Sequence, residues 1–118
     1  MTNNQTPDPS NRRRSAREAP GAVVTVADAL TGERMGQVGD LSAEGLMLIT
    51  QYHIEPGALF QMEFKLADLG EQEHNFNVGA LCLWCSAAQT HSTFWAGFEI
   101  MDISEQDAAT LRDMVVHL

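Results

Sequence analysis

Asp40-Leu41-Ser42-Ala43-Glu44-Gly45 separates two stretches of strand-forming residues, and its chemistry decides how the chain around it folds. A short Asp and a Ser can each bond to the local backbone or to a ligand, and a Gly permits a backbone shape that a side chain hinders. We therefore predict a tight turn here, between a strand over residues 34–41 and a strand over residues 45–50. Gly36 and Gly39 weaken the first strand, and such glycines often mark a bulge or a close approach of a ligand or another backbone.

Further strands follow from composition and from alternation along the chain. In residues 59–66 the apolar side chains recur at every second position, which is typical of a half-buried strand in an antiparallel sheet. Residues 93–100 repeat this pattern, while residues 21–27 and 75–85 are β-branched or largely apolar. Glycine and proline mark the turns at Gly32 and at Pro56-Gly57.

The C-terminus changes from a strand period to a helical one. Ser104 followed by Asp107 resembles a capping box with an acid in the third position, which favours a helix over residues 104–118. One stripe of this helix is apolar, with Met114 beside it, and consists of Ala108, Leu111, Val115 and Leu118. Six strands and one helix fit a mainly β fold, namely a six-stranded antiparallel barrel whose open end or face the helix covers.

The N-terminal region carries the basic charge of the chain. Asn11-Arg12-Arg13-Arg14-Ser15-Ala16-Arg17 holds four of the seven Lys and Arg residues. An Arg fork matches two phosphate oxygens or the O6 and N7 edge of guanine, and its plane can stack on a base. A solvated basic tail is the competing interpretation. Residues 1–11 are polar, with two prolines, and we expect them to be a disordered tail.

Arg13-x-x-x-Arg17 followed by Asp40-x-Ser42-x-x-Gly45 resembles the paired signature of the PilZ domain family. Each motif alone is common, but both in this order and spacing are specific. The resemblance covers residues 12–115, nearly the whole chain, and implies a PilZ-type β-barrel domain over residues 12–118 with an Arg-rich ligand-binding arm at residues 12–17. It also implies that the ligand is the bacterial second messenger cyclic di-GMP.

The resemblance assigns roles to individual residues. Arg13 and Arg17 should contact phosphates and guanine edges, and Asp40 and Ser42 should hydrogen-bond the second guanine. An Arg at position 12 goes with two intercalated ligand molecules in similar domains, whereas Arg14 is either a further contact or solvated. Gly45 would shape the turn and touch the ligand by its backbone at most. Trp84 either stacks on a guanine face or belongs to the core. The predicted ligand-binding residues are thus Arg12, Arg13, Arg17, Asp40, Ser42, Gly45 and Trp84.

Length and charge restrict the class of function. A chain of 118 residues is one domain. No apolar run is long enough to span a membrane and no secretory signal is visible, so we expect a cytoplasmic protein without membrane insertion. Residues 18–118 carry three Lys or Arg against fifteen Asp or Glu, a net charge of −12. So acidic a body repels polymeric nucleic acid but can still accept a small anion at a local Arg cluster.

Other reactive side chains do not form a recognisable site in the sequence. Cys82 and Cys85 make a C-x-x-C, but on a strand two residues three apart point to opposite faces, so we expect reduced, buried thiols rather than a zinc or redox site. The four histidines fall in expected loops or at the terminus and form no metal-ligand spacing. No catalytic motif appears, so we expect neither an enzyme nor a cofactor.

These observations favour a cytoplasmic receptor that binds cyclic di-GMP and signals to an unidentified effector protein. We expect the arm to be mobile until the ligand orders it, and the effector would read that change. The alternative is a PilZ-like protein–protein interaction module that acts without nucleotide. A small barrel binding single-stranded nucleic acid is a third hypothesis, which the acidic body disfavours.

Overall fold

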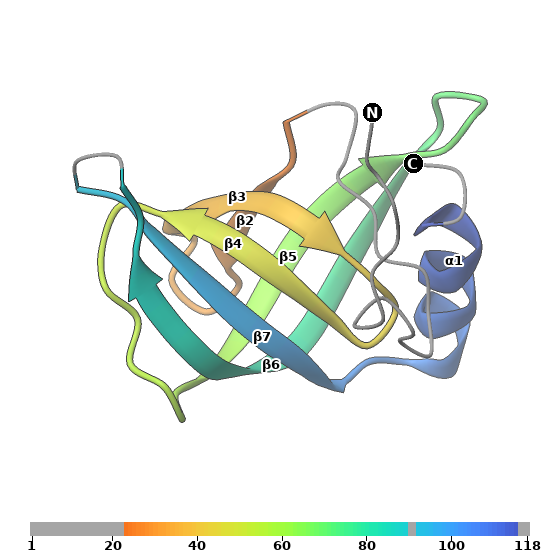
Figure 1. The fold of residues 1–118 in the computed structure, drawn as a ribbon. Coiled ribbons are helices and arrows are strands. Elements are labelled where there is room, and N and C mark those ends of the chain that lie inside the picture. The colour runs from red at the N-terminus through yellow and green to blue at the C-terminus, as the bar shows by residue number, and fades with distance from the viewer. Residues whose placement is uncertain (1–22, 90–91, 116–118) are drawn as a thin grey trace, which may run out of the picture.

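Six antiparallel strands close into a barrel, with one helix after the last strand (Figure 1). The structure, a computed structural model, describes residues 23–89 and 92–115. Around the barrel the strands run in the order β2-β3-β4-β7-β6-β5, and β5 returns to β2. The elements are β2 (Thr25–Asp28), β3 (Arg34–Leu41), β4 (Gly45–Thr50), β5 (Leu59–Ala67), β6 (Glu73–Ala87), β7 (Phe94–Asp102) and α1 (Glu105–Val115). The prediction of a mainly β, six-stranded antiparallel barrel with a C-terminal helix is confirmed.

The strands agree with the sequence pattern most closely around the central turn. β3 and β4 have the bounds expected for residues 34–41 and 45–50, and β5 and β6 extend the expected ranges by one or two residues. β7 begins one residue later than expected and ends two residues later. Of the first strand expected over residues 21–27, residues 21 and 22 lie outside the described chain, and β2 begins at Thr25 and ends at Asp28. The carbonyl of Val24 still accepts a hydrogen bond from the Val38 amide at 2.9 Å, so the chain already lies against β3 before β2 begins.

Alternation places one face of each strand in the barrel interior. Along β5, Met62, Phe64 and Leu66 are buried while Glu63 and Lys65 are exposed, as the period of two requires. The rings of Phe64 and Phe76, both buried, stack with centroids 5.5 Å apart. Burial of such side chains is the main stabilising term, at roughly 1.5–3 kcal/mol for each large apolar side chain.

The two glycines of β3 stand where another strand comes close. A Cβ on Gly36 would overlap the carbonyl oxygen of Ile49, and one on Gly39 would lie 2.7 Å from the Met47 methyl carbon. The β3–β4 register also shifts between Val38 and Asp40, so Gly39 lies in a bulge. The expected bulge and close approach are therefore both present.

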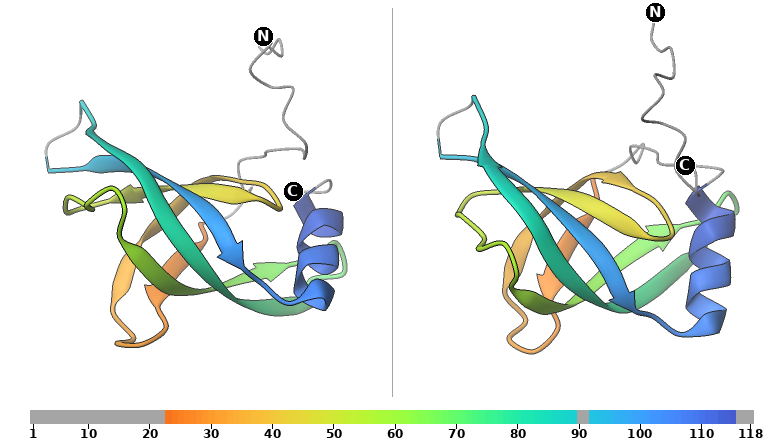
Figure 2. Two further views of the ribbon diagram at one scale, coloured as in Figure 1. Left: turned by 90° about the horizontal axis from the view of Figure 1, so that it is seen from below. Right: turned by 60° about the horizontal axis from the view of Figure 1, so that its bottom comes forward.

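Helix α1 covers one end of the barrel (Figure 2). Its first turn is capped as predicted, since the amide of Asp107 donates to the Ser104 hydroxyl at 3.1 Å. Leu111, Met114 and Val115 join the same core cluster as the strands, as expected, whereas Ala108 of the predicted stripe is half-buried and lies outside this cluster. Leu118, also expected on this stripe, lies outside the described residues. In the described part of the chain no helix is long and apolar enough to cross a membrane.

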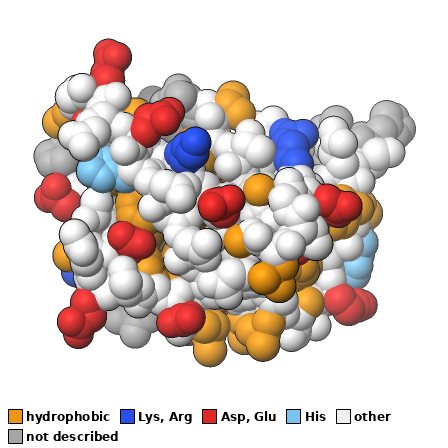
Figure 3. All heavy atoms as spheres, turned by 180° about the vertical axis from the view of Figure 1, so that it is seen from behind, with side chains coloured by type: hydrophobic (Ala, Val, Ile, Leu, Met, Phe, Trp, Pro, Cys, Tyr) orange, Lys and Arg blue, Asp and Glu red, His pale blue; other side chains and the backbone are white. Residues whose placement is uncertain are grey.

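Acidic side chains are spread over the outside of the barrel (Figure 3). In the same view, apolar side chains gather along the lower edge of the molecule. The barrel therefore presents an acidic exterior with at least one apolar region, and it supplies few cations of its own for an anionic ligand.

Candidate ligand-binding site

The turn from Asp40 to Gly45 is held by its own serine. The Ser42 amide donates to the Gly45 carbonyl at 2.8 Å, and the Ser42 hydroxyl accepts from the amides of Glu44 and Gly45 at 3.3 and 3.2 Å. The hydroxyl also lies 3.3 Å from the Gly45 carbonyl oxygen, to which it can donate. Only 1% of Ser42 is exposed. Its hydroxyl therefore bonds within the turn, where it fixes the directions of both strands.

Asp40 lies just before this turn, on the outer face of the barrel. Its Cα partner across the β3–β4 ladder is Met47, and the bulge at Gly39 precedes it on β3. The flanking residues Val38 and Leu41 are buried, whereas Asp40 is half-buried. The bulge thus directs a carboxylate outward at the point where the strand leads into the turn.

A second bulge places Trp84 on the same outer face. The β6–β7 register shifts between Cys82 and Trp84, so both Leu83 and Trp84 are exposed on consecutive positions. Trp84 pairs with Gly97, and a Cβ on Gly97 would overlap Nε1 and Cε2 of the indole. The indole thus lies against a bare stretch of backbone and is 43% exposed. The alternative that Trp84 is a core side chain does not hold in this structure.

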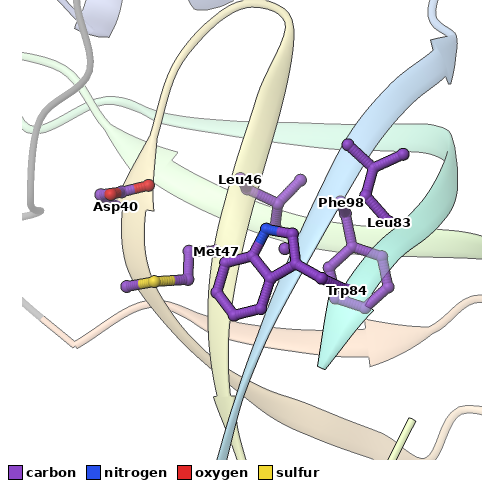
Figure 4. Close-up of a pocket in the computed structure, with 7 residues that line it drawn as sticks. Asp40, Leu46, Met47, Leu83, Trp84 and Phe98 are labelled. Atoms are coloured by element: carbon purple, nitrogen blue, oxygen red, sulfur yellow. The ribbon is translucent and has the colours of Figure 1, made fainter. Parts of the chain in front are cut away.

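The registers align these residues in one row across four strands. Asp40 pairs with Met47, Met47 pairs with Gly97, and Gly97 pairs with Trp84. Neighbouring strands are about 4.8 Å apart, so the row spans roughly 14 Å from the first backbone to the last. Figure 4 shows Met47 between the Asp40 carboxylate and the indole of Trp84.

This row lines a hollow of about 270 Å³ on the barrel exterior. Leu83 forms part of its wall, and Leu46 and Phe98, whose side chains belong to the core, complete the lining. An exposed indole face is suited to stacking on a nucleobase. The Asp40 carboxylate can accept hydrogen bonds from ring or amino N–H groups, such as those on the Watson–Crick edge of guanine. The hollow therefore offers the two contacts that fix a base, a stacking surface and an acceptor.

Among the residues that the structure describes, no Lys or Arg lines this hollow. Arg12, Arg13 and Arg17 lie outside the described residues. Asp40 is the ionisable residue that lines the hollow, and its charge is negative. A phosphate group at this place would need positive charge brought by another segment, and the sequence offers the four Arg of residues 12–17.

The structure also shows lining residues that sequence reasoning did not single out. Met47 and Leu83 read as ordinary strand positions, and only the registers and the bulge bring them to the hollow. Gly97 joins them through its close contact with the indole of Trp84. Two adjacent apolar residues on β6 are both exposed, whereas simple alternation along a strand would bury one of them. Alternation alone therefore does not place Leu83 at the hollow.

The bulge also corrects the expected geometry of the two cysteines. Because Leu83 and Trp84 both face outward, Cys85 turns inward again and packs against the same core as Cys82. The sulfurs therefore do not point to opposite faces. Both thiols are free, but Cys85 is only half-buried. Burial raises the pKa of the Cys82 thiol, with a smaller effect from the neighbouring Cys85, which keeps Cys82 protonated and unreactive.

Histidines and acids do not assemble a metal site in the part of the chain that the structure describes. The expectation that all four histidines lie in loops is wrong for His74, which lies in β6 and contacts the Asp68 carboxylate at 2.9 Å. His53 lies in a loop and its ring meets the edge of Phe94. His91 and His117 lie outside the described residues.

Comparison with known proteins identifies the class. The family model for the PilZ domain matches residues 11–117. This chain therefore belongs to the PilZ domain family.

Two solved structures have the same fold. The inhibitor of motility MotI/DgrA from Bacillus subtilis superposes with a TM-score of 0.75 at 15% identity, covering 90% of this chain and 50% of that protein, so this chain spans about half its length. The PilZ domain of YcgR from Escherichia coli, solved with c-di-GMP, superposes with a TM-score of 0.67 at 16% identity, covering 91% of each chain. No curated protein matches this sequence significantly.

Proposed function

We propose that this protein is a receptor for cyclic di-GMP that acts as an adaptor toward another protein. The observation that carries the proposal is the cross-strand row, which brings Asp40 and Trp84, far apart in sequence, to one hollow beside the Asp40–Gly45 turn. Membership of the PilZ family and the likeness to a PilZ domain solved with c-di-GMP support the choice of ligand.

In this proposal the hollow holds a guanine base and the arm holds the phosphates. The Trp84 indole stacks on the base, a contact of about 1–3 kcal/mol, while the Asp40 carboxylate accepts hydrogen bonds from its edge. Arg13 and Arg17 bind phosphate oxygens and guanine edges through their forks. Ser42 acts by holding the turn that positions Asp40, and Gly45 acts through its backbone.

The described part of the chain that follows the arm runs beside β3. The Val24 carbonyl bonds to the Val38 amide, two residues before Asp40, so the chain approaches the barrel beside the site. Arg17 precedes Val23 by six residues, which span at most about 20 Å when fully extended. Ligand binding can therefore bring the arm onto the barrel, and the resulting change in shape and charge is the signal that a partner protein reads. Arg12 adds contacts to a second, intercalated ligand molecule.

Calorimetric titration with cyclic di-GMP tests the proposal. Wild type is compared with an Arg13→Ala, Arg17→Ala double variant and with the control Arg112→Ala, which removes one Arg from helix α1. The double variant should lose at least ten-fold in affinity, about 1.4 kcal/mol, while Arg112→Ala keeps wild-type affinity. A stoichiometry near two supports the role of Arg12, and Arg12→Ala should then reduce it to about one.

The same titration distinguishes the rival functions. Wild type without measurable binding would overturn the receptor proposal and favour a PilZ-like interaction module that acts without nucleotide. Equal affinity of wild type and the double variant for cyclic di-GMP would mean that the arm does not contribute to ligand binding. Titration with a single-stranded oligonucleotide should give no binding, because the acidic barrel repels a polyanion.

A further inference from the structure

The outer face of β5, β6 and β7 carries an apolar patch next to the ligand hollow. We define the patch by three exposed residues and one half-buried residue, namely Leu59, Leu83, Met101 and Leu81. Leu59 is 71% exposed, Leu83 52% and Met101 57%. Their neighbours of opposite phase, such as Phe60 and Cys82, pack in the core, so the exposure follows from the strand period and not from a frayed end.

The registers make this patch continuous. Leu59 pairs directly with Leu81 across the β5–β6 ladder, and Leu83 lies two positions further along β6. On the β7 side, Leu81 pairs with Glu99, and Met101 is the additional residue of the irregularity between the Ala80–Ile100 and Gly79–Asp102 pairs. The directly paired Leu59 and Leu81 have Cβ atoms about 5 Å apart, and Leu83 and Met101 extend the apolar surface along β6 and β7 on either side of the Leu81–Glu99 pair.

Acidic and polar residues surround the patch. Glu99 and Asp102 border it on β7, Glu55 is in the turn before Leu59, and all three are exposed. On the opposite side a hydrogen bond of 2.9 Å joins the side chains of Gln61 and Asn77. Lys65 is the only Lys or Arg between residues 55 and 102, and it lies six positions from Leu59 at the far end of β5. An apolar centre with a polar rim is the usual anatomy of a protein–protein interface.

The charge of the rim decides between two occupants. A second copy of this chain would bring an equally acidic surface, since residues 18–118 carry a net charge of −12. Like charges across an interface are costly, whereas a basic rim on the partner would be attracted and steered toward the patch. The patch therefore fits a protein with an apolar centre and a rim of Lys or Arg.

The patch also shares residues with the ligand hollow. Leu83 belongs to both, and Trp84 of the hollow follows it in the same bulge. A ligand stacked on Trp84 would touch one edge of the patch and change the shape and charge that the partner meets. Binding at the two surfaces is then thermodynamically coupled, because each occupant alters the affinity for the other.

We propose that the patch is the docking surface for a basic-rimmed protein partner and that cyclic di-GMP regulates this docking through the Leu83–Trp84 bulge. The docking surface stands on the exposure, registers and charges given above. The regulation rests on the proposed function, since it requires the nucleotide to occupy the hollow.

The test uses the full chain and an amphipathic peptide as a stand-in for the partner. A short fluorescein-labelled peptide of alternating leucine and lysine is titrated by fluorescence anisotropy, beside the same peptide with glutamate in place of lysine. The patch variant is Leu59→Ser, Leu83→Ser. The matched control is Leu30→Ser, Leu69→Ser, which removes two exposed leucines from turns elsewhere on the barrel. Thermal unfolding by circular dichroism establishes that both variants are folded.

The lysine peptide should bind wild type and the control variant alike, the patch variant should bind about ten-fold more weakly, and the glutamate peptide should not bind. Equal binding by the patch variant and the control would overturn the docking surface, because general acidity would then explain the affinity. A different outcome would assign the patch to a second copy of this chain. In that outcome wild type self-associates in sedimentation, the patch variant does not, and the lysine peptide does not bind.

A further titration separates the regulation from the docking. Saturation of wild type with cyclic di-GMP should change the affinity for the lysine peptide about three-fold or more, and Trp84→Ala should remove this change. Peptide binding that is unaffected by bound nucleotide overturns the regulation alone. If calorimetry shows that the nucleotide does not bind, the receptor function fails, while the peptide titration without nucleotide still decides the docking surface.

Discussion

The turn at Asp40–Gly45 and the bulge at Leu83–Trp84 form two sides of one site, and they are specified in different ways. The turn is local, because Ser42 bonds to amides and a carbonyl within three residues of itself. The bulge depends on a distant partner, since the Trp84 indole lies flat only where β7 presents Gly97. A short sequence motif therefore specifies one side of the site, whereas the other side forms only when the strands pair. The two sides should respond differently to mutation.

Replacing Gly97 with Val should have the largest effect, because it acts on the side that depends on pairing. The new side chain would occupy the space of the indole, and forcing extra atoms into a packed position costs about 1–3 kcal/mol or more. We expect lower stability in chemical denaturation, a shift in tryptophan fluorescence and a loss of cyclic di-GMP affinity of at least about ten-fold.

Gly70→Ala is the matched control, since its Cβ would meet only the Asp68 carboxylate at an ordinary 3.4 Å. If Gly97→Val and Gly70→Ala gave the same fluorescence spectrum and the same affinity, the indole would not depend on Gly97. The two sides of the site would then not differ in their dependence on strand pairing.

Replacing Ser42 with Ala breaks the local side. The variant leaves the buried amides of Glu44 and Gly45 without the hydroxyl that they bond, which costs about 1–3 kcal/mol. We expect a lower midpoint in urea with an unchanged slope, since the strands themselves remain intact. Trp84 fluorescence should stay as in wild type.

A Ser42→Thr variant keeps the hydroxyl and should recover most of the stability if the extra methyl group fits the turn. Should Ser42→Ala prove as stable as wild type, the serine would owe its place to ligand contact and not to the turn. Ligand affinity measured on the same variants separates these roles, because a turn residue affects affinity only through the position of Asp40.

The two tryptophans of the outer face differ in their position relative to the hollow. Trp84 lines the hollow, whereas Trp95 is 38% exposed on β7 and pairs with Ile49 and Ser86 in the adjacent cross-strand row. We expect Trp84→Ala to weaken cyclic di-GMP binding by about 1–3 kcal/mol in calorimetry, and Trp95→Ala to weaken it by less. Equal losses for both variants would mean that the ligand extends over both rows.

The parts of this fold that could be predicted are those that local chemistry determines. The apolar period and the turn residues predict β3 and β4, and one side-chain hydrogen bond accounts for the Ser104 cap. All three are observed. The position of Cys85 could not be predicted, because a bulge of one residue inverts the alternation after it and leaves no mark in composition. The same bulge determines whether Trp84 is core or surface.

The candidate site was predictable on one side and not on the other. Asp40 was expected at a turn on the basis of its motif, and it lies in β3, two residues before Ser42 of that turn. Its partners Met47 and Gly97 emerge only from the register of three ladders, which a single sequence does not specify. The roles of Arg12, Arg13 and Arg17 remain predictions, since these residues lie outside the described part of the chain.

A second self-bonded turn, far from the site in sequence, provides the smallest and most specific prediction. The Asp68 carboxylate contacts His74 at 2.9 Å and accepts from the amides of Gly70 and Gln72, also at 2.9 Å. The His74 contact, with the Gln72 amide second, lowers the pKa of Asp68 below its usual value of 3.8. Because the folded chain then binds fewer protons than the unfolded chain in acid, this contribution is complete above pH 3.8 and is lost as the pH falls further, through the folded pKa.

Asp68→Asn should therefore lower the Tm slightly near neutral pH, by roughly 3 °C or less for a surface group. The difference in Tm from wild type should shrink as the pH falls below 3.8. Thermal unfolding from pH 7 to pH 2 measures this difference. A difference that stays constant over the whole range would assign the effect to the changed hydrogen-bond geometry and not to the charge. Cyclic di-GMP affinity should be the same in both proteins, because Asp68 bonds within its own turn and does not line the hollow.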